Sequence, residues 1–220
     1  MRIDIIQFDR DVSAGTYGRW LEEWGVECHP VGPDDTVSLR FAEADALLLL
    51  GGHMGVAERE EHPLLREFHA RLPRLVERGM PVLAICLGAQ LLADALGGRA
   101  TARRRGERGV RRISLSEAGE CDPLFAGLSN PFVSFQWHND SFDLPVSATH
   151  LASTEACPGQ AFRCRNAYGL QFHPEVDESI IAGWCRRARV DDAAVREFSE
   201  VREAYQAASR KILQNFLGML

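Results

Sequence analysis

Short apolar runs alternate along the chain with longer segments whose apolar residues recur at helical spacing. The runs predict strands over residues 3–8, 26–31, 46–50 and 82–85, and the longer segments predict helices over residues 18–24, 63–78 and 87–96. Uninterrupted apolar runs are typical of strands that a parallel sheet buries on both faces. The first half of the chain therefore predicts an open, mostly parallel, doubly wound α/β sheet with flanking helices.

The pattern changes in the second half of the chain. Residues 99–135 contain short segments, including 110–115, that favour a small antiparallel addition to the sheet. Strands over residues 161–165 and 170–172 are predicted to form a hairpin around residues 166–169. Functional residues are expected at the carboxyl ends of the parallel strands, where open α/β sheets bind their ligands.

Residues 191–220 place apolar side chains among charged ones at roughly helical spacing, which predicts an amphipathic helix that is continuous or broken. A chain of 220 residues with 45% hydrophobic content can bury one large core. We therefore expect a single domain over residues 1–220, with residues 191–220 as a C-terminal helical extension.

A cysteine occupies the junction between a predicted strand and a predicted helix. The apolar run 82–85 leads directly into Cys86, so the thiol is expected on a sharp turn at a helix N-terminus. Unpaired backbone N–H groups and the helix dipole favour a thiolate there over a thiol. A cysteine in an apolar strand is by itself more often a packing residue, so its chemistry depends on the rest of the chain.

A histidine and a carboxylate follow the last predicted strand. His173 and Glu175 are two positions apart, so in extended backbone both side chains point to the same side. Glu175 can orient the imidazole and stabilise its charged form, while the other ring nitrogen takes the proton from Cys86. Alone, such a pair is usually a surface ion pair. Together with Cys86 it predicts a nucleophile, a base and a group that orients the base.

Paired glycines follow the strand predicted over residues 46–50. Gly51 and Gly52 permit unusual backbone conformations and let N–H groups approach a substrate closely. The N–H of Gly52 or its neighbour, together with the N–H of Leu87, would form an oxyanion hole. The alternative is an ordinary strand-to-loop turn.

These segments together resemble a known family. Residues 51–52 (Gly-Gly), 86–90 (Cys-Leu-Gly-Ala-Gln) and 173–175 (His-Pro-Glu) follow the order of class I, or triad, glutamine amidotransferases. Residues 135–145 resemble the Trp-His-x-Asp signature of stand-alone proteins that are similar to the amidotransferase domain of GMP synthase. The resemblance covers roughly residues 2–190 and implies a flavodoxin-like fold.

The resemblance assigns a role to each matching position. It implies that Cys86 is the nucleophile, His173 the general base and acid, and Glu175 the residue that orients it. The remaining matches would bind the γ-glutamyl substrate, and they are Gly51, Gly52, Gln90, Trp137, His138, Asn139 and Asp140.

The chain departs from the family at one position. His53 occupies the place where the family commonly has proline after the paired glycines. Either the loop is looser, or His53 contacts the substrate, or it is a surface histidine, which is the commoner case for such a residue. It is not expected to be a second catalytic base.

The resemblance leaves three functions open. The first is a glutaminase that hydrolyses the glutamine side-chain amide through a γ-glutamyl thioester and passes ammonia to a separate acceptor enzyme. The second is a free-standing γ-glutamyl peptidase or hydrolase. The third is an inactive partner-binding domain, which has no chemical need for Cys86, His173 and Glu175 together.

Composition restricts partners and location. Six cysteines without Cys-x-x-Cys spacing, and a strand in place of a signal peptide at the N-terminus, favour a reducing, cytoplasmic location. Seven histidines without zinc-ligand spacing predict no metal, and the proposed chemistry needs no cofactor. A net charge of −6 argues against nucleic acid or an anionic membrane as a partner.

Two charged segments have alternative interpretations. Arginines between Arg103 and Arg112 would form a docking patch for an anionic substrate or a partner, or a solvated edge strand. The extension over 191–220 would pack on its own domain, or it would form an interface in a homodimer or with a synthase.

Overall fold

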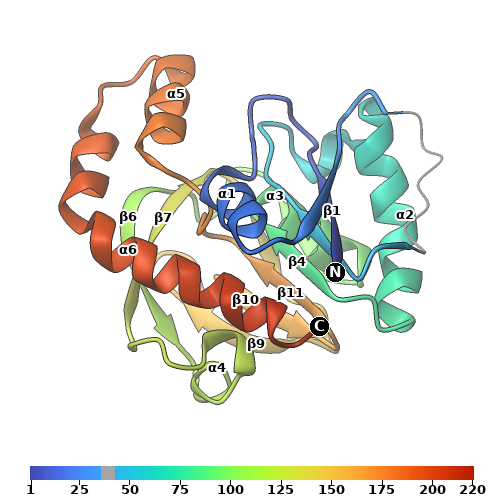
Figure 1. Ribbon diagram of the computed structural model, residues 1–220. Helices are drawn as coiled ribbons and strands as arrows, with labels where there is room; N and C mark the ends of the chain where they lie inside the picture. Colours follow the sequence, from blue (N-terminus) through green and yellow to red (C-terminus); the bar gives the residue numbers. More distant parts are fainter. Residues whose placement is uncertain (36–42) are drawn as a thin grey trace.

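The computed structural model describes residues 1–35 and 43–220, which form strands and helices in alternating order (Figure 1). The first part of the chain consists of β1 (Arg2–Ile6), α1 (Gly15–Glu23), β2 (Glu27–Val31), β3 (Ala46–Leu49), η2 (Val56–Glu61), α2 (Pro63–Glu77), β4 (Val82–Ile85) and α3 (Leu87–Ala95). The remainder consists of β5 (Arg99–Thr101), β6 (Glu107–Leu115), α4 (Glu117–Glu120), η3 (Pro123–Phe125), β7 (Phe132–His138), β8 (Ser141–Asp143), β9 (Thr149–Ser153), β10 (Ala161–Cys164), β11 (Ala167–Leu170), α5 (Glu178–Ala188) and α6 (Ala193–Leu217).

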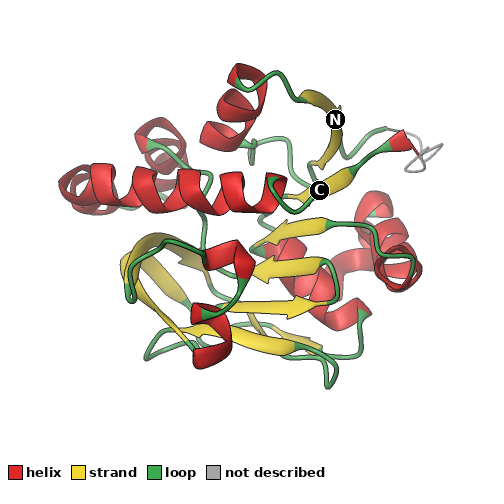
Figure 2. Cartoon of the chain, turned by 60° about the horizontal axis from the view of Figure 1, so that its bottom comes forward, coloured by secondary structure: helices red, strands yellow, loops and turns green. Residues whose placement is uncertain are grey.

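A nine-stranded sheet forms the centre of the molecule, in the order β2-β1-β3-β4-β11-β10-β9-β6-β7 (Figure 2). Strands β2, β1, β3, β4 and β11 pair in parallel. From β11 onward, each neighbouring pair is antiparallel. The predicted α/β class is confirmed. The antiparallel part continues the main sheet and is larger than the small addition that the sequence predicted, because β6 and β7 are long and pair along most of their length.

Helices cover both faces of the parallel half, as the predicted doubly wound arrangement requires. On one face, Tyr17 of α1 and Phe216 of α6 pack in the same core cluster as Ile85 of β4. On the other face, Phe68 of α2 and Leu91 of α3 pack in a second cluster (Figure 1). Strands β3 and β4 are buried on both faces, which explains their uninterrupted apolar sequences.

The hairpin of β10 and β11 is present, but its turn and its second strand lie at other residues than predicted. The turn consists of Arg165 and Asn166 alone, and Arg165 adopts a left-handed conformation with φ of 55°. Gly169 lies inside β11, opposite Phe162 of β10. A Cβ atom at Gly169 would lie 2.2 Å from Cε1 of Phe162, so the glycine provides the space that the buried ring fills. This glycine is thus a packing residue in a strand and not a turn residue.

The C-terminal segment forms one continuous helix, α6, that packs on its own chain. Phe198, Tyr205, Ile212 and Phe216 are buried along one side, and the helix contacts β6, β7, η3 and α5. In Figure 1 it crosses the antiparallel half of the sheet. The first of the two alternatives for this segment, packing on its own chain, is therefore the one observed. None of the described helices combines the length and the apolar character that crossing a membrane requires.

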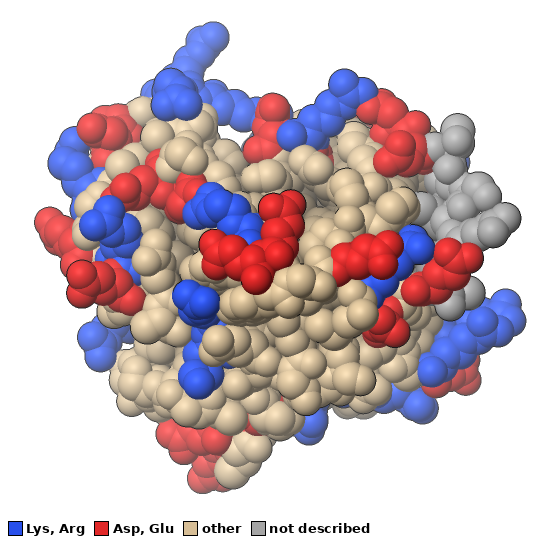
Figure 3. Space-filling view, viewed as in Figure 1, with Lys and Arg blue, Asp and Glu red and all other residues tan. Residues whose placement is uncertain are grey.

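Charges of both signs are interspersed over the face shown in Figure 3, and no broad area of that face carries a single sign. Ion pairs account for part of this mixture, including Arg19 with Asp177 and Arg202 with Glu178. Exposed pairs of this kind contribute little to stability.

The parallel strands place the chain segments of interest at one edge of the sheet. Strands β1, β3 and β4 end just before Asp9, Gly51 and Cys86, and β11 ends just before the segment that contains His173. The carboxyl ends of parallel strands meet at the same edge, so segments far apart in the sequence come together there.

Replacing Gly169 with alanine is expected to lower the free energy of unfolding by about 1–3 kcal/mol, because the new methyl group would overlap the buried ring of Phe162. Urea unfolding measures this change. Gly183→Ala is the control, because a Cβ there meets only a guanidinium nitrogen of Arg186 at 3.8 Å, and the helix interior favours alanine by up to about 1 kcal/mol. Equal stability of Gly169→Ala and the unsubstituted chain would contradict this account of the hairpin.

Candidate active site

Cys86 lies on a strained turn between β4 and α3. Its backbone has φ of 51° and ψ of −109°, a conformation that costs a non-glycine residue about 1–3 kcal/mol. The turn is held on both sides, because Cys86 N donates to Leu170 O (2.8 Å) and Cys86 O accepts from Gln90 N (2.9 Å). The thiol therefore sits at the N-terminus of α3, as the sequence predicted. The side chain is only partly accessible, since the residue is 5% exposed.

Close packing of α3 against β3 brings the Gly51–Gly52 loop beside the cysteine. A Cβ atom at Gly88 would lie 2.7 Å from Leu49 O, so only glycine allows the helix to approach the strand end this closely. A Cβ atom at Gly51 would lie 3.3 Å from Cε1 of His173 and 3.6 Å from Cβ of Cys86. Gly51 thus contacts both residues of the predicted pair.

His173 and Glu175 form a buried pair next to Cys86. His173 Nδ1 is 2.8 Å from Glu175 Oε1, and the two side chains are 3% and 0% exposed. His173 N donates to Phe135 O (2.8 Å), which fixes the backbone of the histidine against β7. Nε2 of His173 forms no hydrogen bond of standard geometry within the described residues.

The surroundings of His173 favour its protonated form. Burial alone lowers the pKa of His173, but the charge of Glu175, followed by the interaction with Cys86, outweighs burial and raises it to about 10. The charge of Glu175, together with burial, also raises the pKa values of Tyr17 and Tyr205. The carboxylate of Glu175 thus favours the protonated form of His173.

Two helices hold the backbone of the His-Pro-Glu segment. Tyr205 of α6 donates its hydroxyl hydrogen bond to His173 O (2.9 Å), with Val176 O at 3.2 Å as a second acceptor. Ser209 of the same helix donates to Pro174 O. From α1, Thr16 donates to Glu175 O through both its backbone N–H (2.8 Å) and its hydroxyl (3.0 Å). Residues that the sequence showed only as part of an amphipathic pattern thus position the histidine and glutamate.

A pocket of about 280 Å³ opens onto Cys86 and His173. Its size lies near the lower end of the range for small-molecule sites, roughly 300–1,000 Å³. The sequence-predicted residues that line it are Gly52, Cys86, Gln90, Trp137, His138, Asn139, Asp140 and His173. Three predicted residues lie next to the pocket residues. Glu175 lies behind His173, Gly51 packs against His173, and Leu87 begins α3 directly after Cys86.

A charged group at the pocket was missed by the sequence analysis. Asp9, 5% exposed, accepts hydrogen bonds from the backbone N–H (3.2 Å) and Nδ1 (2.5 Å) of His53. Arg187 of α5 lies 3.3 Å from the same Nδ1 and pairs with Asp11 at 2.6 Å. Burial raises the pKa of Asp9, but hydrogen bonds from His53 and from the backbone of Asp11 outweigh it and lower that pKa.

His53 is a surface histidine with its side chain 59% exposed, and it also lines the pocket and pairs with a buried carboxylate. The position of Asp9, just after the first strand, was the signal that could have identified this group. Arg187 and the neighbouring pocket residue Trp184 carried no such signal, because they reach the pocket only through the packing of α5.

Aromatic rings form one wall of the pocket. Trp184 packs edge-on against the imidazole of His173, with ring centroids 4.8 Å apart, and Trp137 lies 6.1 Å from Trp184. The guanidinium of Arg108 lies over Trp137 at 5.0 Å from the ring centroid. Of the arginines between Arg103 and Arg112, Arg108 reaches this pocket, whereas Arg104 and Arg105 pair with Asp143.

The floor of the pocket is a hydrogen-bonded network. Gln90 Nε2 donates to Asp140 O (3.1 Å) and to Gln171 Oε1 (3.2 Å). His138 Nδ1 lies 2.8 Å from the same Asp140 carbonyl. The predicted pocket residues from β7 and α3 are thus joined through one backbone oxygen.

The two residues predicted to supply the oxyanion donors are in contact. A Cβ atom at Gly52 would lie 2.8 Å from Cδ2 of Leu87, so the glycine loop contacts the first residue of α3. The N–H of His53 already donates to Asp9, which leaves Gly52 as the better candidate of these two loop residues. The first N–H groups of a helix lack intrahelical acceptors and suit a developing negative charge.

Comparison with known proteins agrees with this geometry. The class I glutamine amidotransferase family model matches residues 18–180. The chain is 32% identical to the glutamine amidotransferase-like protein YfeJ of Salmonella typhimurium, over 96% of this chain and 94% of that protein. It is 31% identical to one subunit of the glutamine-hydrolysing GMP synthase of Thermoplasma volcanium, over 74% of this chain and 79% of that protein.

A solved structure of a glutamine amidotransferase from Thermotoga maritima has a TM-score of 0.88 to this fold at 25% identity, covering 99% of this chain and 98% of the other. Longer GMP synthases also match, and the chain spans 30% of the length of the one from Caldicellulosiruptor saccharolyticus. The chain belongs to the class I glutamine amidotransferase family, and the resemblance inferred from its residues is confirmed.

Replacing Glu175 with glutamine is expected to lower the pKa of His173, because the carboxylate charge is the main influence that raises it against the effect of burial. NMR titration of protein with labelled histidine measures this change. Glu178→Gln, at a half-buried position on α5 that pairs with Arg202, serves as the control and should leave the titration unchanged.

The same substitution should change how stability depends on pH. The protonated imidazole stabilises the fold fully below pH about 6.5, and this stabilisation is lost as pH rises through about 10. The free energy of unfolding should therefore fall less steeply over this range in Glu175→Gln than in the unsubstituted chain. Parallel curves for the two proteins would show that Glu175 does not set the charge of His173.

Proposed function

We propose that the chain hydrolyses the side-chain amide of glutamine through a γ-glutamyl thioester on Cys86. The observation that carries the proposal is the strained Cys86 beside a buried imidazole whose second nitrogen bonds to Glu175. An amide is a poor electrophile, so its cleavage needs a strong nucleophile, donors for the oxyanion and a proton for the departing ammonia. The described pocket offers a group for each requirement.

The proposed steps conserve atoms and charge. The Cys86 thiolate attacks the γ-carbonyl carbon, and the carbonyl oxygen becomes an oxyanion facing the N–H groups of Gly52 and Leu87. Protonated His173 then gives its Nε2 proton to the amide nitrogen, and the C–N bond breaks to release ammonia. In the second half, His173 takes a proton from water, the hydroxide attacks the thioester, and glutamate leaves with the thiolate restored.

Charged side chains at the pocket suit an amino-acid substrate. Glutamine carries an ammonium and a carboxylate at its α-carbon, and the pocket offers Asp140 and Asp9 for the first and Arg108 for the second. Arg108 forms no ion pair among residues 1–35 and 43–220, so its guanidinium remains available to a carboxylate. Its stacking on Trp137 fixes its position without neutralising its charge.

The ammonia is proposed to pass to a separate acceptor enzyme. The support is the similarity to a GMP synthase subunit that is a chain of its own, and to one part of longer GMP synthases. The acceptor substrate is not specified by any residue described above. A homodimer of the chain would be compatible with the same chemistry.

A second candidate is hydrolysis of γ-glutamyl peptides by the same residues. The observation that favours it is a second arginine at the pocket, Arg187, which faces the side of the cavity formed by Asp9 and His53. A γ-glutamyl peptide carries an additional carboxylate in its leaving group, and a second cation would bind it.

Glutamate release from glutamine and from γ-glutamyl dipeptides, measured in parallel, tests the function. Cys86→Ser should lower kcat/KM at least about 10³-fold for whichever substrate is cleaved, because the variant lacks the nucleophile. Cys121→Ser, an exposed cysteine remote from the pocket, is the matched control. A preference for glutamine supports the glutaminase, whereas a preference for peptides supports the second candidate. Activity that survives in Cys86→Ser would overturn both.

Arg108→Gln is expected to raise KM for glutamine about 10- to 100-fold with a smaller change in kcat, since a charge-assisted hydrogen bond to the substrate carboxylate contributes about 1.5–3 kcal/mol. Steady-state kinetics measures both constants. Arg112→Gln, on the same strand but outside the pocket, should behave like the unsubstituted chain. An unchanged KM in Arg108→Gln would remove this arginine from the substrate site.

A further inference from the structure

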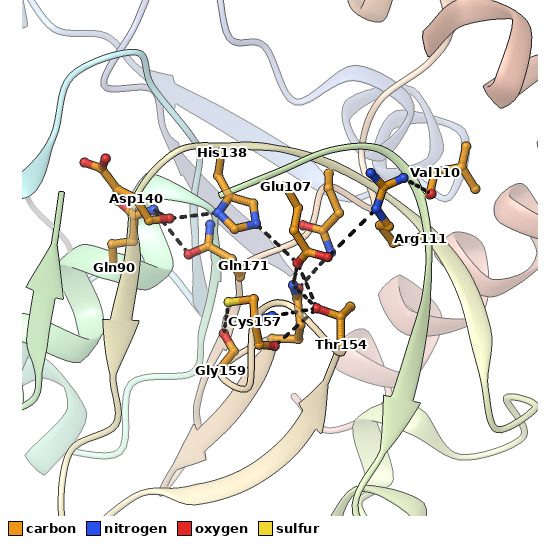
Figure 4. Close-up of polar contacts among 12 residues, drawn as sticks. Gln90, Glu107, Val110, Arg111, His138, Asp140, Thr154, Cys157, Gly159 and Gln171 are labelled. Atoms are coloured by element: carbon orange, nitrogen blue, oxygen red, sulfur yellow. Dashed lines mark hydrogen bonds and ion pairs between the residues drawn. The ribbon is translucent and has the colours of Figure 1, made fainter. Parts of the chain in front are cut away.

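Three potential metal ligands meet behind the wall of the pocket (Figure 4). Glu107 begins β6 and lies directly opposite His138, which ends β7. Cys157 joins them from the turn between β9 and β10. One side-chain atom from each of the three residues lies within 4.8 Å of the others, and all three residues are buried. Nothing in the proposed hydrolysis uses Glu107 or Cys157.

The hydrogen bonding of His138 turns an unprotonated nitrogen toward the cluster. Nδ1 lies 2.8 Å from Asp140 O, and a carbonyl oxygen only accepts, so Nδ1 carries the proton. In the neutral ring, Nε2 then presents a lone pair. Nε2 has no hydrogen-bond partner among the described residues, and it faces Glu107 Oε2 at 3.8 Å with its side chain 1% exposed. A metal-bound histidine commonly has this arrangement of its two nitrogens.

Glu107 places a buried carboxylate at the same point. Its Oε2 accepts hydrogen bonds from Thr154 Oγ1 (2.8 Å) and Gln160 Nε2 (2.6 Å), which orient the group. The side chain is 4% exposed, and its contact with Arg111 is long, at 3.9 Å. A buried carboxylate facing a histidine lone pair is unfavourable unless a proton or a cation lies between them.

Cys157 completes the cluster from a turn of fixed shape. Its N–H donates to Thr154 Oγ1 (3.0 Å), and its carbonyl accepts from Thr154 N (2.9 Å). The hydroxyl of Thr154 also donates to Glu107, so one residue ties the turn to the carboxylate. Among the residues that the structure describes, the thiol itself has only a long contact with Gly159 O, at 3.9 Å.

We propose that Glu107, His138 and Cys157 bind one divalent cation of borderline softness, with Zn²⁺ as the best match. Nitrogen, thiolate sulfur and carboxylate oxygen are the ligands that zinc prefers, and water would fill a fourth, tetrahedral position. The thiol proton leaves to solvent on binding, so Zn²⁺ with one thiolate and one carboxylate forms a neutral site. Tetrahedral ligand atoms lie about 3.3–3.8 Å apart, which requires Cys157 to move in by about 1 Å.

Binding there would stiffen the pocket wall. His138 contacts Asp140 O, the same carbonyl that accepts from Gln90, and His138, Asp140 and Gln90 all line the substrate pocket. The cation would hold His138 from behind and so fix the backbone at Asp140. The site is independent of whether glutamine is the substrate.

Metal binding is tested in the Cys86→Ser variant, because Cys86 and His173 could themselves capture zinc. The full chain is freed of metal with a chelator, incubated with ZnCl₂ or CoCl₂ alone, and separated from unbound ion. We expect one equivalent of metal per chain, a thiolate-to-cobalt charge-transfer band in the near ultraviolet, and a melting temperature that rises with zinc concentration.

Two further substitutions in the same background separate this site from others. Cys157→Ser should remove the charge-transfer band and weaken zinc binding at least about 100-fold, while Cys164→Ser, a buried cysteine outside the cluster, should retain both. Glu107→Gln keeps the shape of the carboxylate and provides a second test if Cys157→Ser does not fold. Absence of bound metal, or equal binding by the Cys157 and Cys164 variants, would overturn the proposal and leave a proton between Glu107 and His138.

Discussion

The buried pair of His173 and Glu175 is the constraint on which the site depends. The two ionisable side chains are 3% and 0% exposed, so both have lost their hydration. A buried pair of this kind is stable only if its geometry is fixed and its polar atoms have hydrogen-bond partners. The protein meets this requirement through the backbone. Hydroxyls from Tyr205, Ser209 and Thr16 bind the carbonyls of the His-Pro-Glu segment, and they leave the side chains to bond with each other. Because Tyr205 and Ser209 belong to α6, the last helix of the chain is part of the support for the histidine.

The cysteine is positioned by a different device. Cys86 is held in a strained conformation by β4 before it and α3 after it, and both elements are buried almost completely. The rigid core can sustain that strain because strand and helix would both have to move to relieve it. Gly88 has no side chain, so α3 can approach the end of β3 closely, and Gly52 likewise lets the glycine loop approach α3. The position of Cys86 is therefore set by the parallel half of the sheet, and the position of His173 by contacts with α1, α6 and β7.

Features that depend on neighbouring residues were predicted from the sequence, and features that depend on tertiary contacts were not. The strand over 82–85, the turn at Cys86 and the pairing of His173 with Glu175 depend on local pattern, and the sequence predicted them. The turn of the β10–β11 hairpin was misplaced because glycine is typical of turns, and only the structure shows that Phe162 packs on Gly169. The place of Asp9 just after the first strand was a signal that the sequence did carry, whereas Trp184 and Arg187 reach the pocket through the packing of α5, which no spacing along the chain records. The cluster of Glu107, His138 and Cys157 was missed for the same reason, since zinc-ligand spacing cannot detect ligands that a strand pairing and a separate turn bring together.

The parallel and antiparallel halves of the sheet contribute different residues to the pocket. The parallel half supplies Cys86, the glycine loop and the strand that leads to His173, which are the groups that act on the amide in the proposed steps. The antiparallel half, through β6 and β7, supplies Arg108, Trp137 and His138, none of which touches the reacting bond in the proposed steps. Helix α5 adds Trp184 and Arg187 from the other side. In the proposed steps Cys86 and His173 would treat glutamine and a γ-glutamyl peptide alike, so discrimination between the two would come from the β6–β7 pair and from α5.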